Sequence, residues 1–196
     1  MTAAILAALL GFAFVTTVTP GPNNLMLMAS GANFGFRRTV PHMLGIAGGV
    51  SLMALLVGLG LMALFEAIPL LGTVLKVVSV LYLLWLAFRI ATAAPIEDRA
   101  AHARPMTLMQ AAAFQWVNPK AWAMCLSAIT ICAPGRTLPS VVLVALAFAL
   151  VSLPAISVWA WLGTVIRQWL SSRRRLQVFN LTMASLLILS LYPLVA

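Results

Sequence analysis

Residues 2–34 read TAAILAALLGFAFVTTVTPGPNNLMLMASGANF, and this stretch decides the fold. It is apolar on both sides of the triplet Pro20-Gly21-Pro22, and it is too long to be one straight membrane span. Proline removes a backbone donor and clashes with the preceding turn, so the triplet ends one helix. Proline is also well placed at the first position of a new helix, which predicts a span broken into two half-helices.

The whole chain has the composition of a membrane protein. Of its 196 residues 63% are hydrophobic and 8% are charged, whereas an average soluble domain carries about 25% charged residues. Spanning segments must satisfy their backbone polar groups internally, as helices do. The sequence therefore predicts an all-α integral membrane protein and excludes a soluble enzyme, a disordered protein and a DNA-binding domain. The net charge of +9 is scattered between apolar runs, which indicates topology signals and anionic lipid rather than nucleic acid.

Six apolar stretches are candidate membrane spans. They cover residues 2–19, 40–64, 68–90, 108–132, 138–165 and 176–195. A hydrophilic linker near the middle of the chain separates two sets of three helices. Because each set holds an odd number of helices, the second set inserts upside down. The predicted organisation is a first three-helix repeat over 1–93, a cytoplasmic linker over 94–107 and a second, inverted repeat over 108–196.

The arginines predict the orientation of these spans. One set of alternate loops holds nine of them: Arg37, Arg38, Arg89, Arg99, Arg104, Arg167, Arg173, Arg174 and Arg175. The opposite loops hold only Arg136. Positively charged loops stay in the cytoplasm, so both termini are expected outside it.

A second break is predicted at Gln115-Trp116-Val117-Asn118-Pro119-Lys120. Asn118 can cap a helix and Pro119 can occupy its first turn, a pattern typical of a helix start. Lys120 then lies in the first turn of the new half-helix, where a cation opposes the helix dipole at membrane depth. An intramembrane charge is a functional candidate. The alternative is a lysine whose stem snorkels to the inner face.

The two breaks open the two halves of the chain, as interrupted helices do at the binding sites of transporters. Two half-helix N-termini and one ammonium favour an anion, whereas the acids Glu66, Glu97 and Asp98 lie at the end of the second span and in the linker. We therefore expect the anion to be the carboxylate of a small ligand. The residues expected to bind this ligand are Pro20, Gly21, Pro22, Asn23, Asn24, Gln115, Asn118, Pro119 and Lys120.

Further residues are candidates for the lining of the site or for proton coupling. Gly45 and Gly49 are spaced for close helix approach, and they could also line the path. Trp116 and Trp122 flank the second break and either wall the site or pack. With no carboxylate in the spans, only Lys120 and His42 are evident titrating groups for proton coupling, although His42 also suits an interfacial position.

Nothing in the sequence suggests an enzyme, a cofactor or a metal site. Cys125 and Cys132 are seven residues apart on one predicted helix, so their Cα atoms lie ~10.5 Å apart, too far for a disulfide. Two alternatives to a transporter stay open: a heavy-metal or thiol-handling membrane protein that uses these cysteines, and a non-transporting scaffold. Small-residue faces also allow a homodimer.

The sequence resembles the LysE/RhtB family of bacterial amino-acid exporters. The similar motifs are TPGPNN (19–24), GFRR (35–38), LKVVSVLYLLWLAFRIATAAP (75–95) and QWVNPKAW (115–122). The resemblance implies six helices in two inverted triplets, a place in the inner membrane and proton-driven efflux of amino acids by alternating access. Pro20, Gly21, Pro22 and Asn23 then match one signature break of the family, and Asn118, Pro119 and Lys120 match the other.

The resemblance also bears on the substrate. The linker IATAAPIEDRAAHARPMTL (90–108) looks closest to the branch that exports cysteine and O-acetylserine. Some members of the family have an acid in the fifth helix, but here FALVSLPAISVWAWLG (148–163) has none. A cationic substrate would need such a buried carboxylate. The expected substrates are therefore small neutral amino acids of the cysteine, O-acetylserine, homoserine or threonine type, with the ammonium held by carbonyls freed near Thr16, Thr17 and Gln115.

Overall fold

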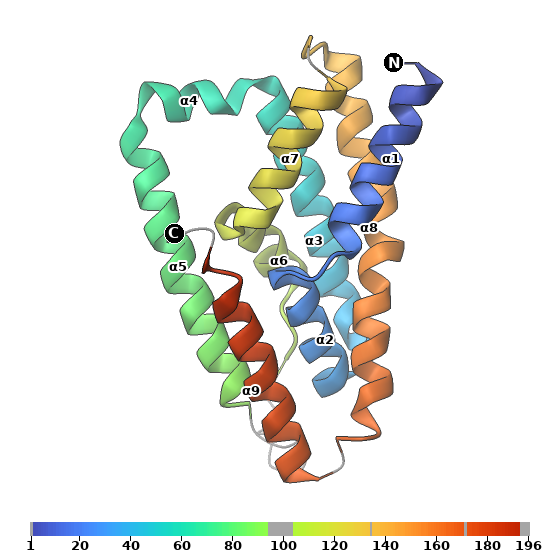
Figure 1. Cartoon of the computed structure of the whole chain (residues 1–196), viewed down its shortest axis with the longest axis vertical. Coiled ribbons are helices and arrows are strands. Elements are labelled where there is room, and N and C mark those ends of the chain that lie inside the picture. The colour runs from blue at the N-terminus through green and yellow to red at the C-terminus, as the bar shows by residue number, and fades with distance from the viewer. Residues whose placement is uncertain (1, 94–103, 134, 171, 193–196) are drawn as a thin grey trace.

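The computed structural model describes residues 2–93, 104–133, 135–170 and 172–192. These residues form helices and no strand, which confirms the predicted all-α class. In chain order the helices are α1 (Ala3–Val18), α2 (Pro22–Phe34), α3 (Phe36–Leu56), α4 (Met62–Ala67), α5 (Pro69–Ala91), α6 (Leu108–Phe114), α7 (Pro119–Cys132), α8 (Leu138–Arg167) and α9 (Arg173–Leu189). A π-helical turn, η1 (Val57–Leu61), joins α3 to α4, and a 3-10 turn, η3 (Gln115–Val117), follows α6. Most helices run along the long axis of the molecule, and α4 lies across one end (Figure 1).

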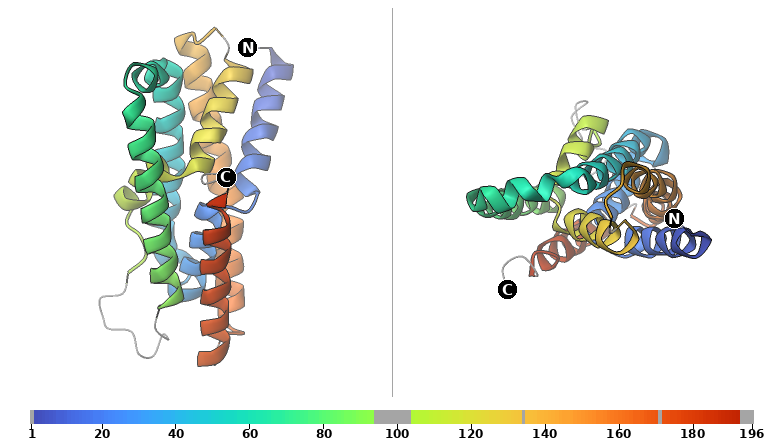
Figure 2. Two further views of the ribbon diagram at one scale, coloured as in Figure 1. Left: turned by 60° about the vertical axis from the view of Figure 1, so that its left-hand side comes forward. Right: turned by 90° about the horizontal axis from the view of Figure 1, so that it is seen from above.

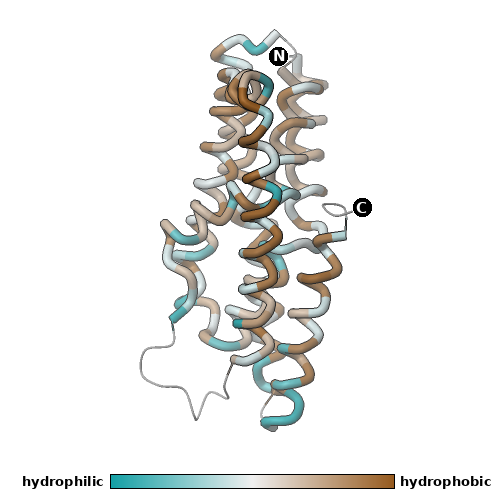
Figure 3. Tube along the Cα trace, turned by 90° about the vertical axis from the view of Figure 1, so that its left-hand side faces the viewer, coloured by the Kyte–Doolittle hydropathy of each residue, from teal (hydrophilic) through white to brown (hydrophobic). Residues whose placement is uncertain are grey.

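Several helices have the length and composition of membrane spans. Among the described residues three helical runs qualify: Phe36–Ala67, Pro69–Ala91 and Leu138–Arg167. The pair α1 and α2 qualifies together and is bent by 56° at its break, whereas α7 is apolar but shorter. Apolar residues extend along the helices between more hydrophilic ends (Figure 3). These apolar helices fit a multi-pass membrane protein.

The predicted break in the first span is confirmed. α1 ends at Val18, and Thr19 is extended with φ −60° and ψ 141°. Gly21 is fully extended with φ 177° and ψ 179°, and Pro22 is the first residue of α2. A residue before proline is pushed out of the helical region, which explains the extended backbone at both Thr19 and Gly21.

The predicted break at Asn-Pro-Lys is also confirmed. α6 passes into the 3-10 turn η3, and Asn118 is extended with φ −96° and ψ 107°. Pro119 then begins α7, as Pro22 begins α2. The predicted span 108–132 is therefore divided into α6 and α7. Both α2 and α7 begin near the middle of the molecule and run in opposite directions (Figure 1).

Two glycines in the left-handed region allow sharp turns between helices. Gly35 has φ 83° and separates α2 from α3. Gly60 has φ 105° and lies where the chain turns from α3 towards α4. Residues with a Cβ rarely adopt these backbone conformations, so glycine is required at both turns.

Several helix contacts of the first half of the chain have counterparts in the second half. α1 and α2 pack on α8, whereas α6 and α7 pack on α3. α3 and α8 pack on each other, and so do α5 and α9. α5 contacts η3, and α9 correspondingly contacts α2. The contact of α1 with α7 has no counterpart of similar extent between α6 and α2, so the two halves agree in part. Seen end-on, α1 and α8 lie on one side of the bundle and α5 on the other (Figure 2).

Glycines allow the closest of these helix approaches. A Cβ at Gly31 of α2 would meet the carbonyl oxygen of Ala160 on α8. A Cβ at Gly163 of α8 would likewise meet the carbonyl oxygen of Met28 on α2. Small residues bring helix backbones together in this way in membranes, where close packing is a main source of helix association.

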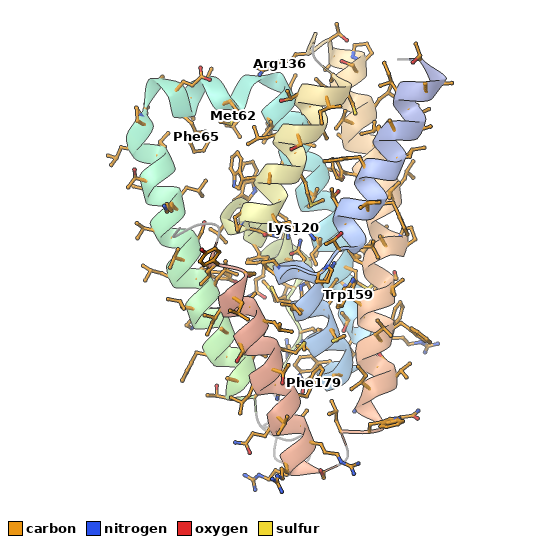
Figure 4. All side chains as sticks on the ribbon, viewed as in Figure 1. Met62, Phe65, Lys120, Arg136, Trp159 and Phe179 are labelled. Atoms are coloured by element: carbon orange, nitrogen blue, oxygen red, sulfur yellow. The ribbon has the colours of Figure 1, made fainter. Side chains whose placement is uncertain are left out.

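The arginines gather at one end of the molecule. Those that the structure describes at this end lie in the first turn of α3, near the end of α5, before α6, at the end of α8 and in the first turn of α9. Arg136 lies at the opposite end, between α7 and α8 (Figure 4). Arg99, like most of the predicted linker 94–107, lies outside the described residues.

Adding a methyl group at Gly163 should disrupt the contact between α2 and α8. The new Cβ would lie 2.9 Å from the backbone nitrogen of Ala32 and closer still to Met28. We expect Gly163→Ala to destabilise the fold by about 1–3 kcal/mol, measured as thermal unfolding of the purified protein in detergent. Gly48→Ala is the matched control because nothing lies within 4 Å of its Cβ position. Equal melting temperatures for the two variants would contradict this packing.

Candidate functional site

Lys120 connects the two helix breaks. Its side chain leaves the first turn of α7 and reaches the extended segment between α1 and α2 (Figure 4). The Nζ atom donates to the carbonyl oxygen of Thr19 at 2.5 Å and to that of Pro20 at 3.4 Å. The ammonium therefore interacts with carbonyl dipoles that the first break has freed. Lys120 does not snorkel to the end of the molecule where the arginines gather.

Other side chains satisfy the remaining carbonyls of the first break. Asn24 Nδ2 donates to the carbonyl oxygens of Thr17 at 2.8 Å and Thr19 at 2.7 Å. Trp159 Nε1, on α8, donates to the carbonyl oxygen of Val18 at 2.9 Å. Freed carbonyls near Thr16, Thr17 and Gln115 are the groups that the sequence suggests for a ligand's ammonium. In the structure the carbonyl oxygen of Thr17 already accepts a hydrogen bond from Asn24.

A reciprocal amide pair joins the two broken helices. Asn23 Nδ2 donates to Gln115 Oε1 at 2.8 Å, and Gln115 Nε2 donates to Asn23 Oδ1 at 3.1 Å. Gln115 is fully buried and also donates to the carbonyl oxygen of Ala111 at 2.9 Å. Asn118 Nδ2 approaches Gln115 Oε1 at 3.5 Å. Buried amides need such partners, so the pair fixes the start of α2 against the end of α6.

The two half-helix N-termini differ in their capping. Asn118 Oδ1 accepts from the backbone nitrogen of Lys120 at 3.2 Å, so α7 is capped by its own N-cap residue. α2 has no side-chain cap, and its N-cap is Gly21. The first-turn N–H groups of a helix have no partner within the helix and carry a partial positive charge. The start of α2 is therefore the better place for an anion.

A small polar cavity lies beside Lys120. Its volume is about 20 Å³, enough for one water molecule but not for an amino acid. The polar lining consists of Thr16, Thr17, Asn23, Asn24, Asn118, Lys120 and Ser152. Three buried oxygens of this lining have no hydrogen-bond partner among the described residues: Thr17 Oγ1, Asn24 Oδ1 and Ser152 Oγ. Unpaired buried polar atoms are rare, and a cluster of three indicates a place for a polar ligand or ordered water.

The site contains a cation and no carboxylate. Glu66, which is exposed on α4, is the only acidic residue that the structure describes. Glu97 and Asp98 lie outside the described ranges. The described interior therefore offers a ligand one ammonium, one uncapped helix start and several neutral oxygens. This arrangement suits a small zwitterion whose own carboxylate supplies the missing negative charge.

The other predicted residues occupy distinct positions. Gly21 lines the small cavity, and a Cβ there would lie 2.7 Å from Lys120 Cδ. Gly45 and Gly49 face α6 instead, since a Cβ at these positions would meet Ala111 Cβ and Ala112 Cα at 2.7 and 2.8 Å. Their role here is close packing.

The two tryptophans form a small aromatic cluster outside the residues that line the small cavity. Trp122 Nε1 donates to the carbonyl oxygen of Trp116 at 2.9 Å, and their rings meet edge to face at 5.9 Å. Phe65 of α4 contacts Trp122 with ring centroids 5.3 Å apart. Of the two roles that the sequence left open for these residues, packing is the one observed here.

Sequence reasoning missed several residues of the small cavity. Ser152 lies on α8, two residues before Pro154, in an apolar segment without an acidic residue. Ile46, Val50, Met124 and Ile156 supply the apolar wall. An apolar residue in a membrane helix carries no signal that separates a cavity wall from a core position. Only the tertiary structure identifies these residues.

A second, larger cavity lies towards the end where the arginines gather. Its volume is about 1140 Å³, and it lies between α2, α3, α5 and α6. The lining includes Ser30, Asn33, His42, Tyr82, Trp85, Arg89, Arg104, Gln110 and Phe114. Asn23 lies one turn before Met26 on α2, and Met26 lines this cavity. The amide pair therefore lies between the two cavities.

The cysteines lend no support to a metal site. Within the four described ranges no group of three or more His, Cys, Asp or Glu side chains is placed to hold a metal ion. Cys125 is buried, and its Sγ approaches the carbonyl oxygen of Val50 at 3.6 Å. Cys132 is also buried. Both behave as core residues of α7.

Breaking the amide pair should destabilise the fold. We expect Asn23→Ala and Gln115→Ala each to cost about 1–3 kcal/mol, because each removes both hydrogen bonds of the pair and Asn23→Ala also deprives the buried Gln115 amide of its Asn23 partner. The double variant should then cost less than the sum of the two single variants. Thermal unfolding of the four proteins measures this coupling. Strictly additive effects would contradict a direct interaction between the two amides.

The chain is similar to known transport proteins. The model of the LysE type translocator family matches residues 14–191. The chain is 31% identical over 120 residues to the cysteine/O-acetylserine efflux protein of Escherichia coli (strain K12) and 32% identical over 120 residues to that of Salmonella typhimurium (strain LT2). Each alignment covers 61% of this chain, and the chain thereby spans 61% of the relative's length. No solved structure matches the chain. The family is one of translocators, in agreement with the prediction that the chain is not an enzyme, and the match over most of its length shows that the chain belongs to the LysE type translocator family.

Proposed function

We propose that the protein is a secondary transporter that exports small neutral amino acids or their derivatives across the bacterial inner membrane. Family membership and the two relatives described as cysteine/O-acetylserine efflux proteins support an amino-acid exporter. The observation that carries the proposal is the position of Lys120 Nζ, which lies against the first helix break and beside a small polar cavity.

Lys120 and the start of α2 would bind the substrate's carboxylate. Two of the three ammonium donors already contact the carbonyls of Thr19 and Pro20, which leaves a donor for a ligand. A charge-assisted hydrogen bond to a carboxylate is stronger than one to a neutral carbonyl. Gly21 keeps the space in front of the ammonium free of a side chain, because its missing Cβ would meet Lys120.

The three unpartnered oxygens would bind the substrate's ammonium. Thr17 Oγ1, Asn24 Oδ1 and Ser152 Oγ are neutral acceptors beside the same cavity. They replace the backbone carbonyls that the sequence suggested for this role. Because none of them carries a negative charge, they would hold the ammonium of a zwitterion but not a second cation on its side chain. This supports neutral amino acids over lysine or arginine.

Six spans in two inverted repeats would provide alternating access. The proposed repeats are residues 1–93 and 108–196, joined by the linker 94–107. The counterpart contacts of α1 and α2 with α8 and of α6 and α7 with α3, together with the opposite directions of α2 and α7, support this arrangement. In such transporters the substrate site lies near the midplane, where broken helices of the two repeats meet.

The two cavities suggest how the site opens. The small cavity beside Lys120 has a volume of about 20 Å³, too small for an amino acid, whereas the larger cavity of about 1140 Å³ lies on the side of the arginines. We assign that side to the cytoplasm because of the positive charge, and the N-terminus then lies outside. Separation of Asn23 from Gln115 would join the two cavities and admit a cytoplasmic substrate.

Proton coupling would depend on few groups. Lys120 lies in the central site, and His42 lines the larger cavity, where Arg89, Arg104 and Tyr82 are the other ionisable groups of the lining. Neither Lys120 nor His42 has a carboxylate partner among the described residues. A proton gradient would therefore act through one or both of these bases.

Removing the charge of Lys120 should abolish transport. In proteoliposomes loaded with serine, cysteine, O-acetylserine, homoserine or threonine, we expect Lys120→Ala to lose counterflow of the labelled amino acid. Lys76→Ala is the matched control, since Lys76 is exposed on α5 away from both cavities. Lys76→Ala should keep the wild-type rate, with and without a proton gradient.

Three outcomes of this experiment contradict the proposal in different ways. Wild-type counterflow in Lys120→Ala would remove Lys120 from the site. No flux of any amino acid through the wild-type protein would favour a non-transporting scaffold. Loss of flux in both lysine variants would indicate a general effect of surface charge. The yield and monodispersity of each variant in detergent check that it has been inserted and folded.

A further inference from the structure

The larger cavity contains a buried side chain without hydrogen bonds. His42 of α3 is 2% exposed, and neither Nδ1 nor Nε2 has a partner among the described residues. His42 nonetheless lines the cavity of about 1140 Å³. Two unpaired ring nitrogens at a cavity wall are a costly arrangement unless something in the cavity pairs with them.

The surroundings of His42 do not satisfy the ring. Ser30 lies on α2, and Thr39 lies on α3, three residues before His42. Their hydroxyls form a hydrogen bond with each other at 2.9 Å. Thr39 Oγ1 also donates to the carbonyl oxygen of Gly35 at 2.9 Å. These hydroxyls therefore have partners of their own, and the imidazole is left to the contents of the cavity.

The neutral imidazole is the form that this position favours. Arg89 and Arg104 line the same cavity, and no described acidic residue does. A further cation buried there without a counter-charge would be unfavourable. A neutral imidazole offers one N–H donor and one acceptor. A hydroxyl both donates and accepts and a thiol does so more weakly, so either group can pair with either nitrogen.

We propose that His42 is a specificity-determining residue that hydrogen-bonds the side-chain hydroxyl or thiol of an amino acid held in this cavity. The inference rests on the proposed function and narrows its substrate class to amino acids with a short, uncharged, hydrogen-bonding side chain. His42 acts before the substrate reaches Lys120, because its cavity lies on the arginine-rich side of the amide pair between Asn23 and Gln115.

The rest of the lining fits the two ends of such a substrate. Arg89 lies over the ring of Trp85, with its guanidinium carbon 5.4 Å from the ring centroid. A guanidinium near the end of α5 is suited to a carboxylate. Tyr82, Phe114 and Met26 supply apolar contact and no negative charge. The cavity exceeds the size of one amino acid, so it serves as a vestibule with a polar position at His42.

Displacement of water explains why the hydroxyl would matter. Water in the cavity can satisfy the ring when no substrate is bound. A substrate with a methyl group in place of the hydroxyl displaces that water without replacing its hydrogen bonds, and it loses affinity. The net value of one such hydrogen bond corresponds to a preference of about tenfold.

The test compares amino acids that differ only by this group. Unlabelled serine and 2-aminobutyrate, or homoserine and norvaline, compete with labelled serine for counterflow in proteoliposomes. Wild-type protein should favour the hydroxyl compound by about tenfold. His42→Leu should bring this preference close to one. His42→Gln keeps a donor and an acceptor and should keep most of the preference. Lys76→Ala, a change outside this lining, should leave it unchanged.

Two results would overturn the inference. One is a wild-type preference that persists in His42→Leu. The other is a His42→Gln variant that loses both the preference for the hydroxyl compound and the dependence of flux on a proton gradient. Glutamine cannot titrate, so this result would show that the imidazole acts as a proton carrier. If the wild-type protein carries none of these amino acids, the proposed function fails as well. If the wild-type protein transports these amino acids and His42→Leu keeps the wild-type preference, only the role of His42 is contradicted.

A second measurement is independent of transport. His42→Leu removes two unpaired buried nitrogens, so its melting temperature in detergent should equal or exceed that of the wild type. Serine should raise the melting temperature of the wild type more than 2-aminobutyrate does. In His42→Leu the two compounds should give equal shifts. A serine-specific shift that survives in His42→Leu contradicts the assignment.

Discussion

The contact between the Lys120 ammonium and the carbonyls of the first break is the interaction on which the site depends. A lysine in the middle of a membrane protein is costly unless its charge is balanced. Here Pro20 and Pro22 end one helix and start another, and the freed carbonyl oxygens of Thr19 and Pro20 receive the ammonium. The carbonyl dipoles balance the charge of the ammonium only in part, so the binding of a ligand's carboxylate beside it would still be favourable.

The rest of the fold serves to bring the two breaks together. Gly31 and Gly163 let α2 and α8 approach closely, while Gly45 and Gly49 do the same for α3 and α6. α8 then supplies Trp159 to the carbonyl of Val18 and Ser152 to the small cavity. The Asn23–Gln115 amide pair and the Lys120 side chain then connect the two breaks.

The sequence predicted the breaks and the lysine because proline chemistry is local. Pro22 and Pro119 mark helix starts wherever the helices lie, and a lysine among apolar residues is conspicuous in any register. The partners of these groups could not be predicted in the same way. Ser152, Trp159 and the exact role of Gln115 depend on how helices rotate about their axes, and that rotation is set by packing between distant segments. His42 was noted only as a titrating or interfacial residue for the same reason.

The central claim is that the positive site at the two breaks binds the carboxylate of an amino acid. Equilibrium binding to the purified protein in nanodiscs is the decisive measurement. It compares the amino acid that is transported fastest with the carboxamide of the same amino acid, which lacks the negative charge. The acid should bind at least about tenfold more tightly than the amide, and Lys120→Met should remove the difference. Equal binding of the acid and the amide to the wild-type protein would contradict it.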